Sequence, residues 1–93
     1  MAIEVLFFSE LKELTGKDRE VIHLENPTLK ELLNSLLNTY PLLEPILCEK
    51  KNRNLRPNIN VAINDKFIQK KDKKFISIKD GDRIAFLLPL SGG

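Results

Sequence analysis

Five leucines in the first half of the chain constrain its fold more than any other feature. They recur at the spacing i, i+3, i+4, i+7 and i+8, which places them on one stripe of an α-helix. They are Leu29, Leu32, Leu33, Leu36 and Leu37. Thr28 can accept a hydrogen bond from the amide of Glu31 while the Glu31 carboxylate reaches back, so we expect the helix to begin there. Pro41 ends it, and its apolar stripe needs a surface to cover.

Segments on both sides of this helix alternate between two faces, as β-strands do. The alternating segments are residues 2–8, 20–24, 60–63, 67–68, 76–78 and 84–88. A short helix or turn over 9–14 is expected to end at Gly16. Laying the leucine helix across the sheet is the simplest way to bury its stripe, which predicts a two-layer α+β domain.

Two basic stretches interrupt the regular pattern. Residues 42–60 contain two prolines, Pro45 and Pro57, and predict a surface loop with a single helical turn near 42–47. Residues 70–74 are too polar to be buried. Lysines and arginines in both stretches could bind nucleic acid or an acidic partner, but interspersed acids and the lack of an aromatic platform favour solvated loops.

Composition excludes several classes of function. The 93 residues suffice for one domain, and 15 basic against 13 acidic side chains give a net charge of +2, too balanced to imply nucleic acid. A single histidine, His23, and a single cysteine, Cys48, provide neither a usual zinc site nor an internal disulfide, and we expect neither residue to be catalytic. No glycine-rich phosphate loop occurs. Without a signal peptide or spanning segment, a cytoplasmic protein is expected.

The same alternation predicts which strand residues face away from the helix. If Phe7 and Phe86 point to the helix, then Phe8 and Leu87 point away from it. Phe67 stands where it could join them. Exposed apolar patches mark partner surfaces, although scattered surface hydrophobics are an equally good reading of the pattern.

The end of the chain carries the clearest functional signal. Only four glycines occur in the sequence, and two of them, Gly92 and Gly93, are its last residues. We divide the chain into a domain over 1–88 and a tail over 89–93. Extended, the tail reaches roughly 15 to 18 Å past the last strand, and glycines fit a narrow channel. Adenylation by ATP would make its carboxylate an acyl donor; a frayed terminus is the plain alternative.

Taken together, these residues resemble the ubiquitin-like sulfur carriers of the β-grasp fold, most closely their molybdopterin synthase branch. The resemblance covers nearly the whole chain. The segments that carry it are 5–8 (Val-Leu-Phe-Phe), 13–16 (Glu-Leu-Thr-Gly), 27–29 (Pro-Thr-Leu), 61–64 (Val-Ala-Ile-Asn) and 80–93, which closes in Leu-Ser-Gly-Gly. The resemblance implies a mixed sheet packed on one main amphipathic helix.

The resemblance also implies a chemistry for the tail. Gly93, preceded by Gly92, would be adenylated by a ubiquitin-activating-like adenylyltransferase that uses ATP, and then converted to a thiocarboxylate. Pro89, Leu90 and Ser91 would carry it into the large subunit of a heterotetrameric synthase. There the sulfur would form the dithiolene of molybdopterin, the organic part of the molybdenum cofactor.

A docking surface follows from the resemblance as well. The positions that match the family's partner-binding surface are Phe8, Phe67 and Leu87. The chain itself would then be no enzyme, because catalysis lies mainly in the partner. We also expect it to bind no metal, cofactor, nucleic acid or membrane by itself. The stretches 42–60 and 70–74 look longer than in compact members, and Leu87 stands where an aromatic residue is common.

Two other functions remain open on the sequence. A carrier for tRNA thiolation or a protein modifier shares the chemistry up to the adenylate or thiocarboxylate but has another acceptor. A β-grasp binding module with an inert tail belongs to a different class, and it predicts that deleting Gly92 and Gly93 leaves function intact.

Overall fold

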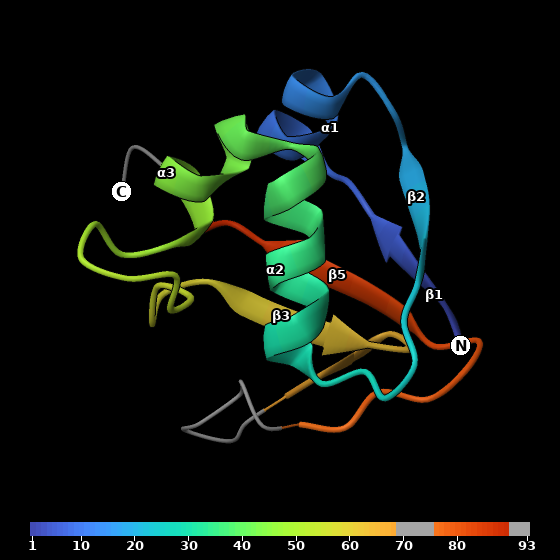
Figure 1. Ribbon diagram of the computed structural model, residues 1–93. Coiled ribbons are helices and arrows are strands. Elements are labelled where there is room, and N and C mark those ends of the chain that lie inside the picture. The colour runs from blue at the N-terminus through green and yellow to red at the C-terminus, as the bar shows by residue number, and fades with distance from the viewer. Residues whose placement is uncertain (69–75, 90–93) are drawn as a thin grey trace.

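The computed structural model describes residues 1–68 and 76–89, in which a five-stranded sheet carries its main helix across one face (Figure 1). The strands are β1 (Ala2–Leu6), β2 (Arg19–His23), β3 (Asn60–Ile63), β4 (Lys66–Phe67) and β5 (Arg83–Leu87). The helices are α1 (Ser9–Thr15), α2 (Leu29–Thr39), the 3₁₀ turn η1 (Pro41–Leu43) and α3 (Glu44–Leu47).

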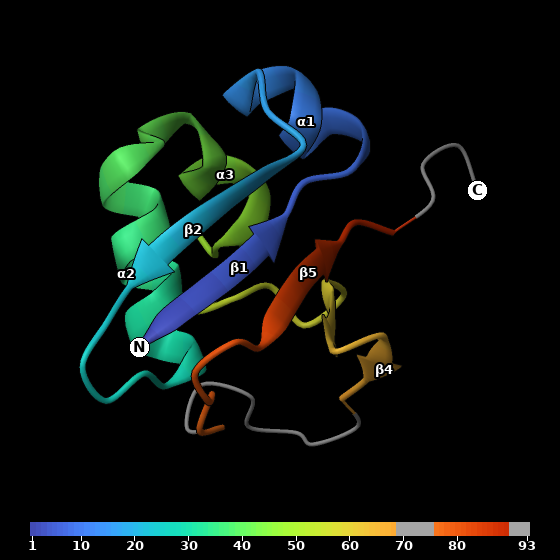
Figure 2. The ribbon, with the colours of Figure 1, turned by 90° about the vertical axis from the view of Figure 1, so that its right-hand side faces the viewer.

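The first and last strands lie side by side in the sheet. β1 and β5 are parallel, with Val5 opposite Ile84, and the strand order is β2-β1-β5-β3-β4 (Figure 2). β2 pairs antiparallel with β1, while β3 pairs antiparallel with both β5 and β4. The mixed sheet under one main helix is the β-grasp arrangement, as expected from the sequence.

Helix α2 begins and packs as its sequence predicts. The Thr28 hydroxyl accepts a hydrogen bond from the Glu31 amide at 3.2 Å, which supplies the expected N-cap. All five leucines of the stripe are buried, none more than 4% exposed. Opposite them lie buried residues of β1 and β5 and the residue just after β1: Ile3, Val5, Ile84, Phe86 and Phe7. The two-layer core is therefore confirmed.

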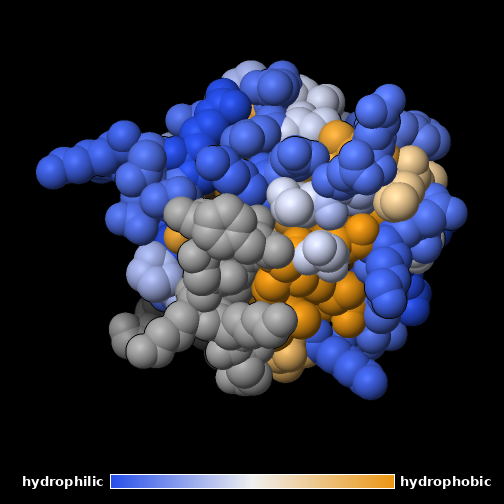
Figure 3. Space-filling view, turned by 60° about the horizontal axis from the view of Figure 1, so that its bottom comes forward, coloured by the Kyte–Doolittle hydropathy of each residue, from blue (hydrophilic) through white to orange (hydrophobic). Residues whose placement is uncertain are grey.

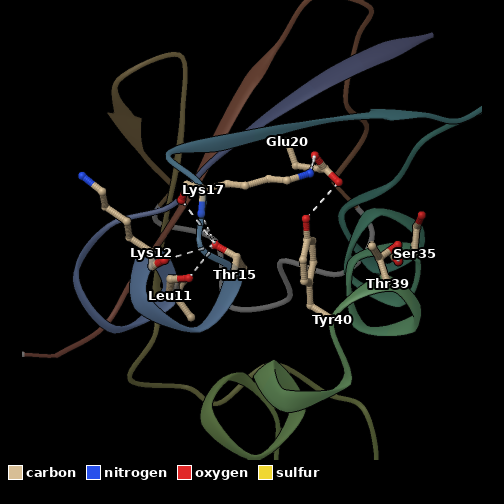
Figure 4. Close-up of polar contacts among 8 residues, drawn as sticks. All are labelled: Leu11, Lys12, Thr15, Lys17, Glu20, Ser35, Thr39 and Tyr40. Carbon is tan, nitrogen blue, oxygen red and sulfur yellow. Dashed lines mark hydrogen bonds and ion pairs between the residues drawn. The ribbon is translucent and has the colours of Figure 1, made fainter.

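A polar cluster closes the core where α2 ends (Figure 4). The Tyr40 hydroxyl donates to Glu20 at 3.0 Å, and the Lys17 ammonium contacts the other Glu20 oxygen at 3.1 Å. The hydrogen bond from Lys17 holds the pKa of the Glu20 carboxyl below its usual range. Because the Tyr40 ring packs edge-on against Phe7, with ring centroids 5.8 Å apart, the cluster fixes the inward direction of Phe7.

Two expectations about the strands need correction. The first strand ends at Leu6 rather than at residue 8, because the chain already turns into α1 there. Residues 76–78 form only an isolated bridge, Thr28 to Ser77, since they pair with the start of α2 instead of entering the sheet. Leu88 lies past the end of β5, where it is half-buried and packs against the core. The basic stretch 70–74 lies outside the described residues.

Candidate partner-docking surface

A row of side chains crosses the sheet on the face away from α2. Leu6 of β1 stands opposite Ala85 of β5, Ala85 opposite Ala62 of β3, and Ala62 opposite Phe67 of β4. Residues in register on neighbouring strands share a face. Two small alanines between larger side chains therefore leave a shallow apolar hollow. Its apolar lining, which we call the sheet patch, is Leu6, Phe8, Ala62, Phe67, Ala85 and Leu87.

The three residues predicted to face outward all belong to the sheet patch. Phe8 is 49% exposed, which confirms the prediction from alternation, and Phe67 is 59% exposed and joins it. Leu87 faces the same hollow but is half-buried. Two large aromatic side chains are thus exposed near each other, one between β1 and α1 and one on β4, which gives the surface the character of a docking site.

The remaining members of the sheet patch were missed in the sequence. Ala62 and Ala85 stand beside inward-facing residues, so the same alternation assigns them to the outer face. Alanine, however, carries little weight in an apolar pattern. Only the pairing of β1 with β5 brings Leu6 and the two alanines into one row.

The exposure of Phe8 is built into the backbone on either side of it. The Phe7 amide donates to the Asp18 carbonyl at 2.8 Å, and Phe7 is buried. The Phe8 carbonyl accepts from the Leu11 amide at 3.1 Å, the first bond of α1. Ser9, which follows Phe8, adopts φ 51°, a left-handed conformation that a non-glycine residue rarely takes. Phe8 is thus held between two fixed segments.

Phe67 is held by the turn between β3 and β4. Asn64 and Asp65 adopt φ 51° and 71°, the left-handed conformations that suit a two-residue hairpin turn. The Asn64 side chain accepts from the Arg83 amide at 3.0 Å and donates to Asp82 at 2.9 Å. These bonds tie the turn to β5 and set the position of Phe67 beside the hollow.

A second hollow lies where β5 ends, and we call it the tail groove. Residues from α3, from the segment after it and from the end of β5 line it, including Ile46, Arg56, Leu88 and Pro89. Phe8 and Leu87 line this groove as well as the sheet patch. The two surfaces are therefore continuous on either side of the chain as it leaves the sheet.

The tail itself lies mostly outside the described residues. Pro89 is described and exposed. Leu90, Ser91, Gly92 and Gly93 are not described, so their expected roles stay predictions. The division of the chain into a domain over 1–88 and a tail over 89–93 likewise stays a prediction.

The single histidine and the single cysteine lie apart from these surfaces. His23 is exposed on β2, and Cys48 is buried at 1% exposure. Burial raises the pKa of the Cys48 thiol to about 11, which suppresses the reactive thiolate at neutral pH. Within residues 1–68 and 76–89, no three His, Cys, Asp or Glu side chains gather as a metal site would require.

Two further surface properties concern the described part of the chain. Figure 3 views the end of the molecule where α2 begins and shows an apolar area there, framed by polar side chains. Among the described helices, none has the length and apolar character needed to cross a membrane.

With the geometry in place, comparison with known proteins identifies the family. The sequence profile of the ThiS family matches residues 5–93, nearly the whole chain and the diglycine end with it. The chain belongs to the ThiS family. One relative, the molybdopterin synthase sulfur carrier subunit of Chlamydomonas reinhardtii, is 28% identical over 94 residues, with both chains covered in full.

Solved structures agree with the ThiS-family assignment. The small archaeal modifier protein 1 from Methanosarcina acetivorans is 31% identical, with a TM-score of 0.82, over 99% of this chain and 96% of the other. Subunits 1 and 2 of the molybdopterin-converting factor from Helicobacter pylori were solved as a complex. The matching chain there is 27% identical, with a TM-score of 0.62 and full coverage of both chains. The ubiquitin-like fold expected from the sequence is thus shown.

Proposed function

We propose that this ThiS-family chain is the sulfur carrier of molybdopterin synthase. The observation that carries the proposal is the family match, which extends to Gly93. Relatives named molybdopterin synthase sulfur carrier subunit, which match 98 to 100% of the chain, support it. The continuous apolar surface on both sides of Pro89 supplies what a carrier needs, because a partner that takes the tail must also hold the body.

The chemistry belongs to the terminal carboxylate. A carboxylate is a poor electrophile, so its oxygen first attacks the α-phosphorus of ATP, forming the acyl-adenylate at Gly93 and releasing pyrophosphate. A sulfur nucleophile then attacks the acyl carbon and AMP leaves. With hydrosulfide as the nucleophile, the products are the Gly93 thiocarboxylate and a proton. With a donor persulfide, the product is an acyl disulfide, and a second thiol then cleaves its S–S bond, releasing the thiocarboxylate and forming a disulfide with the donor. ATP is bound by an adenylyltransferase of the ubiquitin-activating type and not by this chain.

The body of the carrier supplies recognition. We place Phe8, Phe67 and Leu87 at the contact with the large subunit, while residues 89–93 enter its active site. The complex solved for the Helicobacter pylori subunits supports a large-subunit partner. Catalytic groups other than the thiocarboxylate then belong to that partner. We place the two subunits in a heterotetramer and the complex in the cytoplasm.

The test is thiocarboxylation in a reconstituted system. The full chain is incubated with ATP, the adenylyltransferase and a sulfur source, and its intact mass is measured. We expect the gain that replaces one oxygen by sulfur, and we expect conversion of the pterin precursor once the large subunit is added. Deleting Gly93 should abolish the mass gain while the melting temperature stays unchanged. Wild-type yield from the deleted chain would refute the proposal.

A second function is favoured by one comparison. The Methanosarcina acetivorans relative, named a small archaeal modifier protein, shares more identical residues with this chain than the synthase relatives described above. A modifier would join Gly93 to lysines of other proteins through isopeptide bonds. Mass spectrometry of tryptic digests from cells that express the chain distinguishes the two functions. Trypsin cleaves the chain last after Arg83, so remnants of residues 84–93 on lysines, absent when Gly93 is deleted, would indicate the modifier.

A further inference from the structure

The segment that follows α3 is folded into a defined hairpin. We call residues 49–56 the basic loop. Its two ends are joined by an isolated bridge between Cys48 and Leu55. The Arg56 amide donates to the Leu47 carbonyl at 2.8 Å, which returns the chain to the end of α3. The loop therefore has a fixed base.

Arg53 anchors the basic loop to two helices. Its Nε donates to the Glu44 carboxylate of α3 at 3.1 Å, and its Nη1 donates to the Asn38 side chain of α2 at 3.1 Å. The Arg53 carbonyl also accepts from the Cys48 thiol at 3.6 Å. The position of the loop is thus set relative to the sheet and helices.

The basic loop presents cations that lack a carboxylate partner. It holds Lys50, Lys51, Arg53 and Arg56 against the single acid Glu49. Of the ion pairs in the described part of the chain, only the one between Arg53 and Glu44 involves the loop. Both lysines are exposed. The Arg56 guanidinium donates to the Pro45 carbonyl at 3.1 Å, which satisfies a donor without neutralising the charge.

The basic loop stands beside the point where the chain leaves the sheet. Arg56 lines the tail groove together with Leu88 and Pro89. In Figure 1 the loop after α3 and the red end of β5 lie on the same side of the molecule. A protein that takes up the tail must approach this side. Its surface then comes within the roughly 8 to 10 Å over which charges act at physiological salt.

We infer that the basic loop docks an acidic surface of the protein that receives the tail, the synthase large subunit. The inference rests on the proposed function, because that function supplies the receiver. The basic loop is continuous with the sheet patch through the tail groove, which supports a protein partner, and its unpaired lysines call for acidic side chains on that partner. Nucleic acid is disfavoured, because residues 41–60 contain no aromatic side chain on which a base could stack. Such cations mainly accelerate association.

The test compares two charge-reversed variants of the full chain. Lys50→Glu with Lys51→Glu alters the basic loop. Lys30→Glu with Lys79→Glu makes the same change in net charge at exposed positions outside the loop, at the start of α2 and before β5. Association and dissociation rates with the purified large subunit are measured by stopped flow at low and high salt, after both variants are shown to melt as the wild type does.

We expect the loop variant to associate about tenfold more slowly at low salt, as loss of electrostatic steering predicts, while the control stays within about twofold. High salt should remove the difference. Equal slowing in both variants would reduce the effect to net charge and overturn the inference, as would an unchanged loop variant. Binding of wild-type chain to tRNA that the loop variant loses would assign the loop to nucleic acid instead.

Thiocarboxylation separates this inference from the function on which it rests. Intact mass is measured for the wild type and the loop variant with saturating adenylyltransferase. A wild-type chain that never gains sulfur refutes the proposed function. Normal thiocarboxylation together with an unchanged association rate of the loop variant refutes only the docking role of the basic loop.

Discussion

Phe7 and Phe8 are neighbours in the chain with opposite surroundings, and truncating each in turn tests how the structure divides stability from binding. Phe7 is 2% exposed and packs on Tyr40, whereas Phe8 is 49% exposed in the sheet patch. Phe7→Ala removes a buried ring and should cost about 3 to 5 kcal/mol. In a domain of this size that lowers the melting temperature by roughly 15 to 30 °C.

The expected values for Phe8→Ala follow from its half exposure. A phenylalanine side chain offers about 200 Å² to burial. Phe8→Ala removes the half of the ring that is already buried in the free chain, except for the area that the alanine methyl group keeps. The expected loss in the free energy of unfolding is about 1 to 2 kcal/mol. The exposed half becomes buried only when the large subunit docks. At about 25 cal/mol per Å² it contributes roughly 2 kcal/mol to binding, so Kd should rise about 30-fold.

Melting followed by circular dichroism and titration calorimetry with the large subunit give both numbers. Val21→Ala is the matched control, because Val21 is 51% exposed on β2 and is not among the residues of the sheet patch. It should bind as the wild type does. A Kd for Phe8→Ala within about twofold of the wild type would refute the docking role of Phe8. A larger stability loss for Phe8→Ala than for Phe7→Ala would refute its exposed position.

Three further predictions concern the fold. Thr28→Ala should lower stability by about 1 kcal/mol in urea titrations, because the N-cap bond to Glu31 is lost; a loss equally large in Thr28→Ser would contradict this. Tyr40→Phe should lower the free energy of unfolding by about 1 kcal/mol while the ring contact with Phe7 remains. An unchanged free energy would show that the hydrogen bond to Glu20 does not stabilise the fold. Burial raises the pKa of Cys48 to about 11 in the folded chain, against about 8.5 unfolded. The unfolded state then loses its proton first, so stability should fall between these pH values, a slope that Cys48→Ala should lack.

Local pattern predicted what depends on neighbouring residues. Alternation assigned Phe7 and Phe8 to opposite faces, and the Thr28 cap placed the start of α2. The row of side chains from Leu6 to Phe67 could not be predicted from local pattern, because it depends on the parallel pairing of β1 with β5, which are far apart in the sequence. The pattern over 76–78 was strand-like, yet those residues were bound by the segment before α2.

The basic loop shows the same limit. Its charge and its position outside regular structure follow from composition. Its anchorage follows from Arg53 reaching α2 and α3, contacts that no spacing rule contains. Burial of Cys48 likewise depends on how the loop closes over the core.

The parallel pairing of β1 with β5 has a consequence for the life of the chain. During synthesis, β1 cannot complete its pairing in the sheet until β5 has been made, because β5 lies between β1 and β3. Contacts so distant in sequence slow folding, and a nascent chain lacking its final strand has no complete sheet. A chain truncated before β5 would therefore lack the central strand of the sheet as well as the glycines that follow it.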